Sequence, residues 1–259
     1  MPVPSLRPRS PSEIVDAAFQ LLRAHYGAFV TCSAIAYAPI LLLRLVVLGD
    51  PTRFLGQEPG TVTPDFWWYT GSGLLVSWLT FSLMSAVLQV CTSQVYLGGE
   101  MDVGAAVREA LPRTPQVIVT AVIRFVVMMI ALMLLLFPVL YVVPLLFAVT
   151  PVIIIERRGI WTAMRRSAFL SRGRKWHILN TLGLVAIIYY LLVIGFSVVA
   201  SIFGNFVVAT VVSAAVTVLV YPVVAIAETL LYYDARIQSE GLDIELMTGA
   251  LDATPARPA

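Results

Sequence analysis

Long uncharged apolar runs dominate the pattern of hydrophobic and polar positions along this chain of 259 residues. Residues 125–155 and 176–227 contain no Asp, Glu, Lys or Arg. The hydrocarbon core of a bilayer is about 30 Å thick and takes roughly 20 mostly apolar residues per helical crossing, whereas a water-soluble domain has no use for uncharged runs of this length. The pattern therefore predicts an all-α fold, a polytopic membrane helical bundle.

Polar and charged breaks divide the apolar segments into six predicted transmembrane helices. They cover residues 28–48, 73–96, 116–137, 139–155, 178–200 and 206–232. Together they make a six-span membrane domain over residues 28–233. An N-terminal tail with an amphipathic helix is expected over residues 1–27, and a cytoplasmic C-terminal tail over residues 234–259.

The apolar segment 116–155 is too long for one comfortable crossing and barely long enough for two. Basic residues gather on the cytoplasmic side of a membrane, and a single crossing here would separate Arg108 and Arg113 from the basic residues that follow the segment. Two short passes with a turn near Pro138 keep all of these residues on one side. A re-entrant hairpin after Pro138 gives the same sidedness, so both alternatives stay open.

The strongest local signal is a basic cluster in the connector 156–177, between the fourth and fifth predicted spans. Seven of the chain's 17 Lys and Arg residues lie in it, namely Arg157, Arg158, Arg165, Arg166, Arg172, Arg174 and Lys175. Such a loop most often only enforces topology. Because Trp161, Phe169 and Trp176 lie among the cations, the cluster also predicts binding of anionic lipid head groups or of a phosphorylated ligand, with about 1 kcal/mol per cation near an anionic surface.

Amphipathic surface helices are predicted at three inward connections, over residues 14–23, 103–111 and 161–170. Ser10 and Glu13 form a capping box at the start of the first, which we expect to lie flat on the membrane with its apolar side down. Each surface helix leads into an odd-numbered span, which predicts a three-fold repeat of surface helix plus helical hairpin. Sequence identity between the units is slight, so the shared order of elements is better supported than common ancestry.

Polar residues within the predicted spans form a second candidate site. They are Ser82, Ser85, Gln89, Thr92, Arg124, Glu156 and Glu228. Charges inside a bilayer are costly and are usually paired or functional. We favour an ion pair between Arg124 and a carboxylate, with interhelical hydrogen bonds from the polar stripe. The alternative is a polar cavity that opens to the cytoplasm and admits a small polar or amphiphilic ligand.

The sequence offers little support for catalysis or metal binding. His25 and His177 lie at predicted membrane borders, without a neighbouring carboxylate and nucleophile in an identifiable arrangement. Cys32 and Cys91 lie in hydrophobic segments without metal-ligand spacing, as apolar packing residues do. We therefore expect no enzymatic activity, no metal, no cofactor and no nucleic-acid partner.

Three sequence blocks carry a resemblance to a known family. They read LRPRSPSEIVDAAFQLLRAHYGAF, TPVIIIERRGIWTAMRRSAFLSRGRKW and LLYYDARIQSEGLDIELM. They resemble the bacterial multi-pass family labelled glycerophosphoryl diester phosphodiesterase membrane domain, over nearly the whole chain up to about residue 247. The chain shows no HRG-type histidine motif and no metal-binding carboxylate set. The resemblance therefore implies the membrane module without the hydrolase, a stand-alone type largely of unknown function.

These observations leave three functional interpretations. The first is a non-catalytic module of the bacterial cytoplasmic (inner) membrane, with both termini cytoplasmic, that binds anionic lipids or a protein partner. The second is a transporter or permease component, because of the inner polar residues and because Pro138, Pro144, Pro151 and Pro222 can interrupt helices where a cavity is lined. The third and least favoured is an intramembrane enzyme that acts on lipids.

Overall fold

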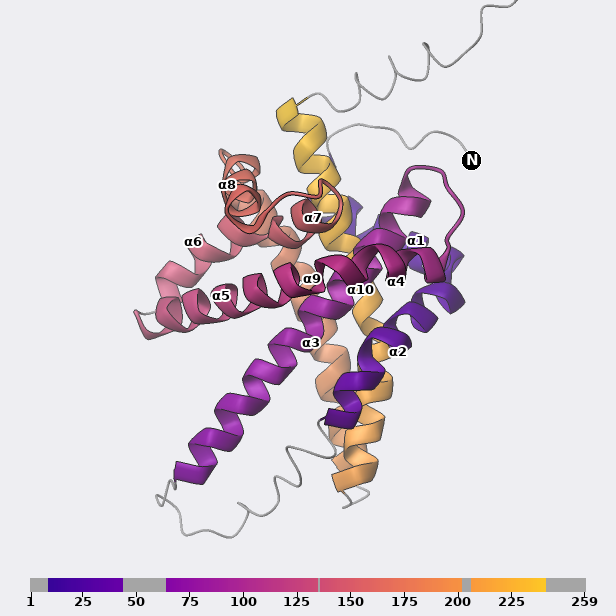
Figure 1. Cartoon of the computed structure of the whole chain (residues 1–259), viewed down its shortest axis with the longest axis vertical. Coiled ribbons are helices and arrows are strands. Elements are labelled where there is room, and N and C mark those ends of the chain that lie inside the picture. The colour runs from indigo at the N-terminus through magenta and orange to yellow at the C-terminus, as the bar shows by residue number, and fades with distance from the viewer. Residues whose placement is uncertain (1–8, 44–63, 135, 202–205, 241–259) are drawn as a thin grey trace, which may run out of the picture.

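The computed structural model describes residues 9–43, 64–134, 136–201 and 206–240, and over these residues the chain is helical without a β-strand (Figure 1). A 3-10 helix, η3 (Leu111–Arg113), links α4 to α5. The α-helices are α1 (Pro11–Ala24), α2 (Tyr26–Leu43), α3 (Pro64–Tyr96), α4 (Val103–Ala110), α5 (Thr114–Met133), α6 (Leu136–Leu146), α7 (Val149–Ile154), α8 (Ile160–Leu170), α9 (Lys175–Ser201) and α10 (Phe206–Glu240).

Four helical stretches are long and apolar enough to cross a membrane. They are Thr70–Tyr96, Val103–Met133, Lys175–Val199 and Thr210–Glu240. Two further apolar helices, Tyr26–Ala38 and Pro138–Ile154, are shorter. Large apolar side chains such as Ile187, Leu191 and Val198 are exposed on the outside of the bundle, an arrangement that suits lipid and not water. The protein is therefore an all-helical, membrane-embedded protein, and the six-span count stays a prediction.

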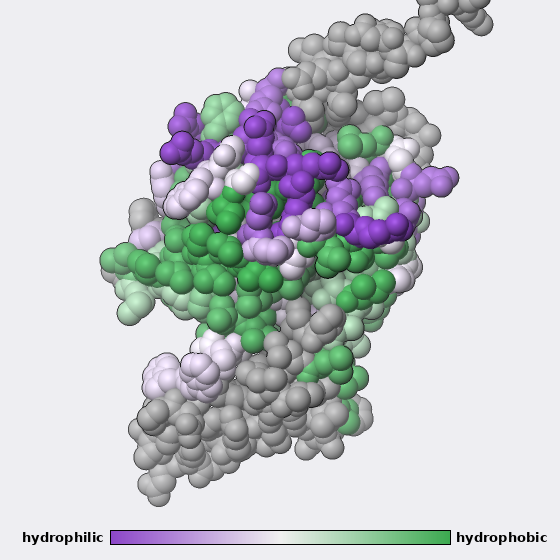
Figure 2. All heavy atoms as spheres, in the orientation of Figure 1, coloured by the Kyte–Doolittle hydropathy of each residue, from purple (hydrophilic) through white to green (hydrophobic). Residues whose placement is uncertain are grey.

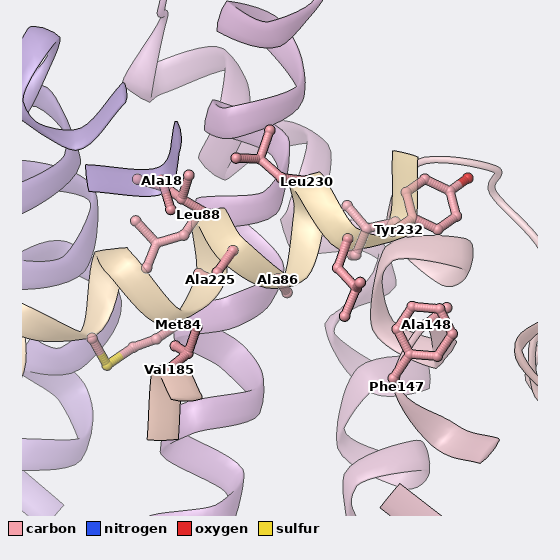
Figure 3. Packing of buried hydrophobic residues seen from close by; sticks show 14 of the residues in the cluster. Ala18, Met84, Ala86, Leu88, Phe147, Ala148, Val185, Ala225, Leu230 and Tyr232 are labelled. Atoms are coloured by element: carbon pink, nitrogen blue, oxygen red, sulfur yellow. The ribbon is translucent and has the colours of Figure 1, made fainter. Parts of the chain in front are cut away.

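The core is built around α3 and α10, which pack against each other. Helix α2 packs against both of them, and α9 packs against α10. Small residues of α10, such as Ala225 and Ala227, are fully buried and let neighbouring helices approach closely, as small residues do between membrane helices. Figure 3 shows Leu88 of α3 close to Ala225 of α10, with Ala18 of α1 beside them. This packing fixes the level of the polar side chains on α3 and α10.

The N-terminal amphipathic helix is present as α1, and its capping box is confirmed. The Ser10 hydroxyl accepts a hydrogen bond from the Glu13 amide at 3.3 Å, while the Ser10 amide donates to Glu13 Oε2 at 2.8 Å. The apolar face of the helix, with Ile14 and Ala18 fully buried, packs against α9 and α10. The expectation that this face lies directly on lipid is therefore not met, because other helices of the protein cover it.

The predicted fourth span, residues 139–155, is not one straight helix. It comprises most of α6 and then α7, and the helix is interrupted between them at Phe147 and Ala148. The turn before it comes at Leu134, where α5 has just ended, so Pro138 lies in the first turn of α6, a position that proline tolerates. Every residue of α7 is buried.

The α6–α7 break is filled by a side chain from α8. The Ala148 amide donates to Ser167 Oγ at 3.0 Å, and the same hydroxyl donates to the Leu145 carbonyl oxygen at 2.8 Å. Ser167 is completely buried. A break in a membrane-embedded helix frees backbone groups that need partners, and here one serine supplies both. The Ser167 side chain therefore satisfies backbone groups at the break and connects α8 to α6 and α7. We call this contact the α6–α7 joint.

The two cysteines lie face to face between α2 and α3. Cys32 and Cys91 are fully buried, and their sulfur atoms are 2.9 Å apart. Both thiols are free. They lie within the hydrophobic core cluster, where the expected packing role places them.

Candidate functional site

Hydrophilic residues gather at one end of the molecule, where α1 and α8 lie on either side of the C-terminal part of α10 (Figures 1 and 2). A sharp change of direction after α7 brings the basic connector to this end. Arg157 has a left-handed backbone conformation (φ 57°), and the Arg158 amide donates to the Val152 carbonyl oxygen at 3.4 Å. The opposite ends of α9 and α10 lie at the other extreme of the molecule (Figure 1). We call the hydrophilic extreme the basic end.

Four of the seven predicted phosphate-binding residues are exposed at the basic end. They are Arg157, Arg158, Arg165 and Arg172. Three exposed aromatic side chains accompany them. They are Trp161 (75% exposed), Phe169 (43%) and Trp176 (72%). We call these seven residues the basic face.

Neutralisation of the exposed cations by acidic residues is limited. Arg157 donates to Glu109 at 2.9 Å, yet its side chain remains 64% exposed. Arg158 lies 3.9 Å from Glu156 and is 60% exposed. The Arg172 guanidinium lies 5.8 Å from the centre of the Phe169 ring, within the range of a cation–π contact. These cations therefore remain accessible to an anionic partner.

Arg166, a fifth predicted residue, is part of an ionic network inside the protein. Its Nε donates to both oxygens of Glu156 at 3.1 Å, and its Nη2 donates to Glu240 Oε2 at 2.7 Å. Arg236 donates to the same Glu240 oxygen at 3.2 Å, and the Tyr232 hydroxyl donates to Glu156 Oε1 at 2.8 Å. These contacts join α8 and the end of α7 to the end of α10.

The electrostatics of Arg166 follow from this network. Burial opposes the charged guanidinium, but hydrogen bonds and charges from Glu240 and Glu156 outweigh it and raise the pKa of Arg166 above its ordinary value. A base whose pKa is raised on folding contributes stability that is fully present below the pKa of the unfolded state. The contribution of Arg166 is therefore complete at neutral pH and is lost only in strongly alkaline solution.

Arg174 and Lys175 lie at the start of α9, and both side chains are partly buried. The Lys175 ammonium lies 3.6 Å from the centre of the Tyr141 ring on α6. Burial lowers the pKa of Arg174, an effect that the Asp234 carboxylate opposes. Asp234 accepts hydrogen bonds from the Arg9 amide at 3.0 Å and from the Gln238 side chain at 2.7 Å. The sequence prediction thus covers two groups, exposed cations and partly buried cations, and of the second group Arg166 and Lys175 contact a neighbouring helix.

The predicted intramembrane cluster is assembled only in part. Ser85 donates to Glu228 Oε2 at 2.9 Å, and Gln89 donates to Ser85 at 2.7 Å and to the same Glu228 oxygen at 3.2 Å. These bonds link α3 to α10, and the predicted interhelical hydrogen bonds are confirmed for Ser85 and Gln89. Ser82 and Thr92 instead donate to carbonyl oxygens of their own helix.

Arg124 and Glu156 differ from the prediction for this cluster. Arg124 Nη1 donates to the Thr150 hydroxyl on α7 at 3.1 Å, and no carboxylate forms an ion pair with it in the part of the chain that the structure describes. Glu156 belongs to the ionic network and not to the Ser85–Gln89–Glu228 cluster. Sequence reasoning missed Arg236 and Glu240, although their spacing of four on one helix is typical of an ion pair.

Replacing Glu228 tests whether the cluster acts through its hydrogen bonds. We expect Glu228→Leu to lower the free energy of unfolding by about 2 kcal/mol, because it leaves the Ser85 hydroxyl without its acceptor and removes one of the two acceptors of the Gln89 amide. Glu228→Gln keeps an acceptor oxygen in place and should cost less than about 1 kcal/mol. Unfolding in mixed micelles with increasing SDS measures both. Equal losses for the two variants would contradict this account.

Comparison with known proteins adds no relative, since no family model, no curated protein and no solved structure matches the chain. Among the described residues, no group of three or more His, Cys, Asp or Glu side chains could hold a metal ion. The fold and the basic end therefore define the class, an all-helical membrane-embedded protein with a cationic, aromatic-rich face at one end.

Proposed function

We propose that this protein is a non-catalytic module of the bacterial cytoplasmic membrane that binds anionic lipid through its basic face. The observation that carries the proposal is the presence of four exposed arginines and three exposed aromatic side chains on and around α8. Tryptophan prefers the membrane–water interface, and arginine binds phosphate oxygens with its planar fork of donors. Together the four cations contribute about 4 kcal/mol near an anionic surface.

The orientation of the chain is part of the proposal. The Arg9 amide bonds to Asp234, and Arg166 of α8 bonds to Glu240. Residue 9, α8 and the end of α10 therefore belong to one side of the bundle, as the predicted cytoplasmic placement of both termini requires. Because basic residues accumulate on the cytoplasmic side, we assign the basic end to that side. Membership of the glycerophosphoryl diester phosphodiesterase membrane domain family remains a proposal from the three sequence blocks.

Neutralising two exposed arginines tests lipid binding. We expect the double variant R165Q/R172Q to bind phosphatidylglycerol about 30-fold more weakly in detergent micelles, because two cations worth about 1 kcal/mol each are lost. The matched control R165K/R172K keeps both charges and should retain most of the affinity. Titration of the purified proteins with the lipid, followed by native mass spectrometry, provides the measurement. Unchanged affinity in the Gln variant would leave the cluster with a topological role alone.

A transporter or permease component is the second candidate. Three buried side-chain oxygens, Ser33 Oγ, Gln89 Oε1 and Thr120 Oγ1, have no hydrogen-bond partner among the described residues, and water could occupy such positions. Two observations favour a packed interior over a cavity. Ser85 and Gln89 bond to Glu228, and Ser167 fills the break between α6 and α7. Labelling of S85C by a small hydrophilic thiol reagent would favour the transporter.

An intramembrane lipid-acting enzyme is least supported, and hydrolysis of glycerophosphodiesters by the purified protein would establish it.

A further inference from the structure

The contact between Lys175 and Tyr141 marks the depth of α6 in the membrane. Lys175 is the first residue of α9 and precedes its uncharged membrane-spanning stretch. A lysine ammonium is strongly hydrated and stays at the interface while its stem lies along apolar surface. Because the ammonium is 3.6 Å from the centre of the Tyr141 ring, the middle of α6 lies at the interface on the side of the basic end.

The remaining part of α6 is too short to reach the opposite interface. From Tyr141 back to Leu136, where α6 begins, five residues span about 7.5 Å at 1.5 Å per residue. The hydrocarbon core is about 30 Å thick. The turn between α5 and α6 therefore lies within the half of the membrane nearer the basic end. A helix that crossed the bilayer here would have to be several turns longer.

The tip of the α5–α6 hairpin has the surface expected inside hydrocarbon. Met133 is 89% exposed, and Ile130, Leu132 and Leu134 are exposed around it. By contrast, the exposed side chains near the start of α3 are Trp67 and Trp68, as expected at an interface. The tip thus carries no interfacial anchor among its described residues. The Leu134 amide, which directly follows α5, donates to the Ile130 carbonyl oxygen at 3.0 Å.

The course of α5 agrees with a shallow position. Its 20 residues are about 30 Å long, which would cross the core if the helix stood upright. Figure 1 instead shows α5 running across α3, at a marked inclination to α9 and α10. An inclined α5 ends at the same shallow level as the start of α6. It also keeps Arg124, in the middle of α5, closer to the interface than an upright helix would.

We propose that α5 and α6 form a re-entrant wedge that occupies only the leaflet next to the basic end, and that its partner is the acyl chains of that leaflet. The wedge enlarges the cross-section of the protein in that leaflet alone. This inference rests on the membrane-embedded fold and does not depend on lipid binding by the basic face. It replaces the two full crossings predicted for residues 116–155 by a re-entrant arrangement whose turn comes at Leu134, before Pro138.

Single cysteines at three levels test the wedge in proteoliposomes. In a C32A/C91A background, M133C marks the tip, R165C the basic end and W68C the start of α3. A membrane-impermeant maleimide should modify R165C from one side only and W68C from the opposite side only, while M133C should react from neither side. A nitroxide on M133C should be accessible to oxygen, inaccessible to a polar nickel reagent, and at a depth within the leaflet of R165C.

Modification of M133C from the side that labels W68C would overturn the wedge in favour of a full crossing. Modification from the side that labels R165C would overturn it in favour of a hairpin on the membrane surface. Should M133C fail to fold, I130C lies one turn earlier on α5 and carries the same test. Loss of anionic lipid binding would change none of these three labelling patterns, so failure of the wedge and failure of the proposed function are distinguishable.

Discussion

Replacing Arg166 by Met is expected to lower the free energy of unfolding by on the order of 3 kcal/mol, since breaking a buried ion pair leaves uncompensated charge behind. The Glu156 side chain is only 9% exposed and the Glu240 side chain 20%. Without Arg166, the cations nearest to the two carboxylates among the described residues are Arg236, which lies 3.2 Å from Glu240 and 3.9 Å from Glu156, and the exposed Arg158, 3.9 Å from Glu156. The variant therefore removes the ionic contact that joins α8 to the end of α10.

The neighbouring residue provides the control for this prediction. Arg165 is exposed on the same helix, so R165M removes the same charge and the same side-chain length without touching the network. We expect R165M to change the free energy of unfolding by less than about 0.5 kcal/mol, as exposed substitutions usually do. SDS titration of both purified variants compares them directly. Equal stability of R166M and R165M would show that the network does not hold the basic end together.

The second large effect is expected for Ser167→Ala, which should cost about 2 kcal/mol, because it leaves buried backbone groups without partners. The lost hydroxyl accepts from the Ala148 amide and donates to the Leu145 carbonyl oxygen. No other side chain is shown to bond to either group in the described structure. We also expect faster hydrogen exchange at Ala148, because its amide loses its acceptor.

Ser171→Ala is the matched control for the joint. Ser171 is as fully buried as Ser167, but its hydroxyl donates only within its own turn, to the Ala168 carbonyl oxygen at 3.0 Å. Its loss should therefore leave exchange at Ala148 unchanged. The comparison uses hydrogen exchange measured by mass spectrometry on peptides that cover the break. Unaltered exchange at Ala148 in S167A would mean that the serine does not close the α6–α7 joint.

The helical, membrane-embedded character of the fold could be predicted from solvation alone. Uncharged runs such as residues 176–227 have no stable place in water, and their length matches the bilayer core. The capping box of α1 was equally readable, because Ser10 and Glu13 interact within one turn. For the break between α6 and α7, the sequence supplied Pro144 and Pro151 as residues that can interrupt a helix, but not the position of the break at Phe147 and Ala148 or its contact with Ser167 of a different helix. Hydropathy records that a segment is apolar and does not record where the helix bends.

The candidate site was predictable at the level of residue type but not of individual roles. Arg165 and Arg166 are adjacent in the sequence and look alike there. Their difference comes from Glu240, 74 positions away from Arg166, which only the packing of α10 brings close. For the same reason, the predicted partner of Arg124 was a carboxylate, whereas the structure gives it the Thr150 hydroxyl. Local patterns identify cations, and tertiary contacts decide which of them remain free.

The placement of the basic end at the cytoplasmic interface is the central claim, and labelling of R165C in bacterial cells tests it most directly. In a C32A/C91A background, a membrane-impermeant maleimide should leave R165C unmodified in intact cells and should modify it fully in inverted membrane vesicles. Modification in intact cells, with protection in inverted vesicles, would place the exposed arginines on the outer surface and contradict the account.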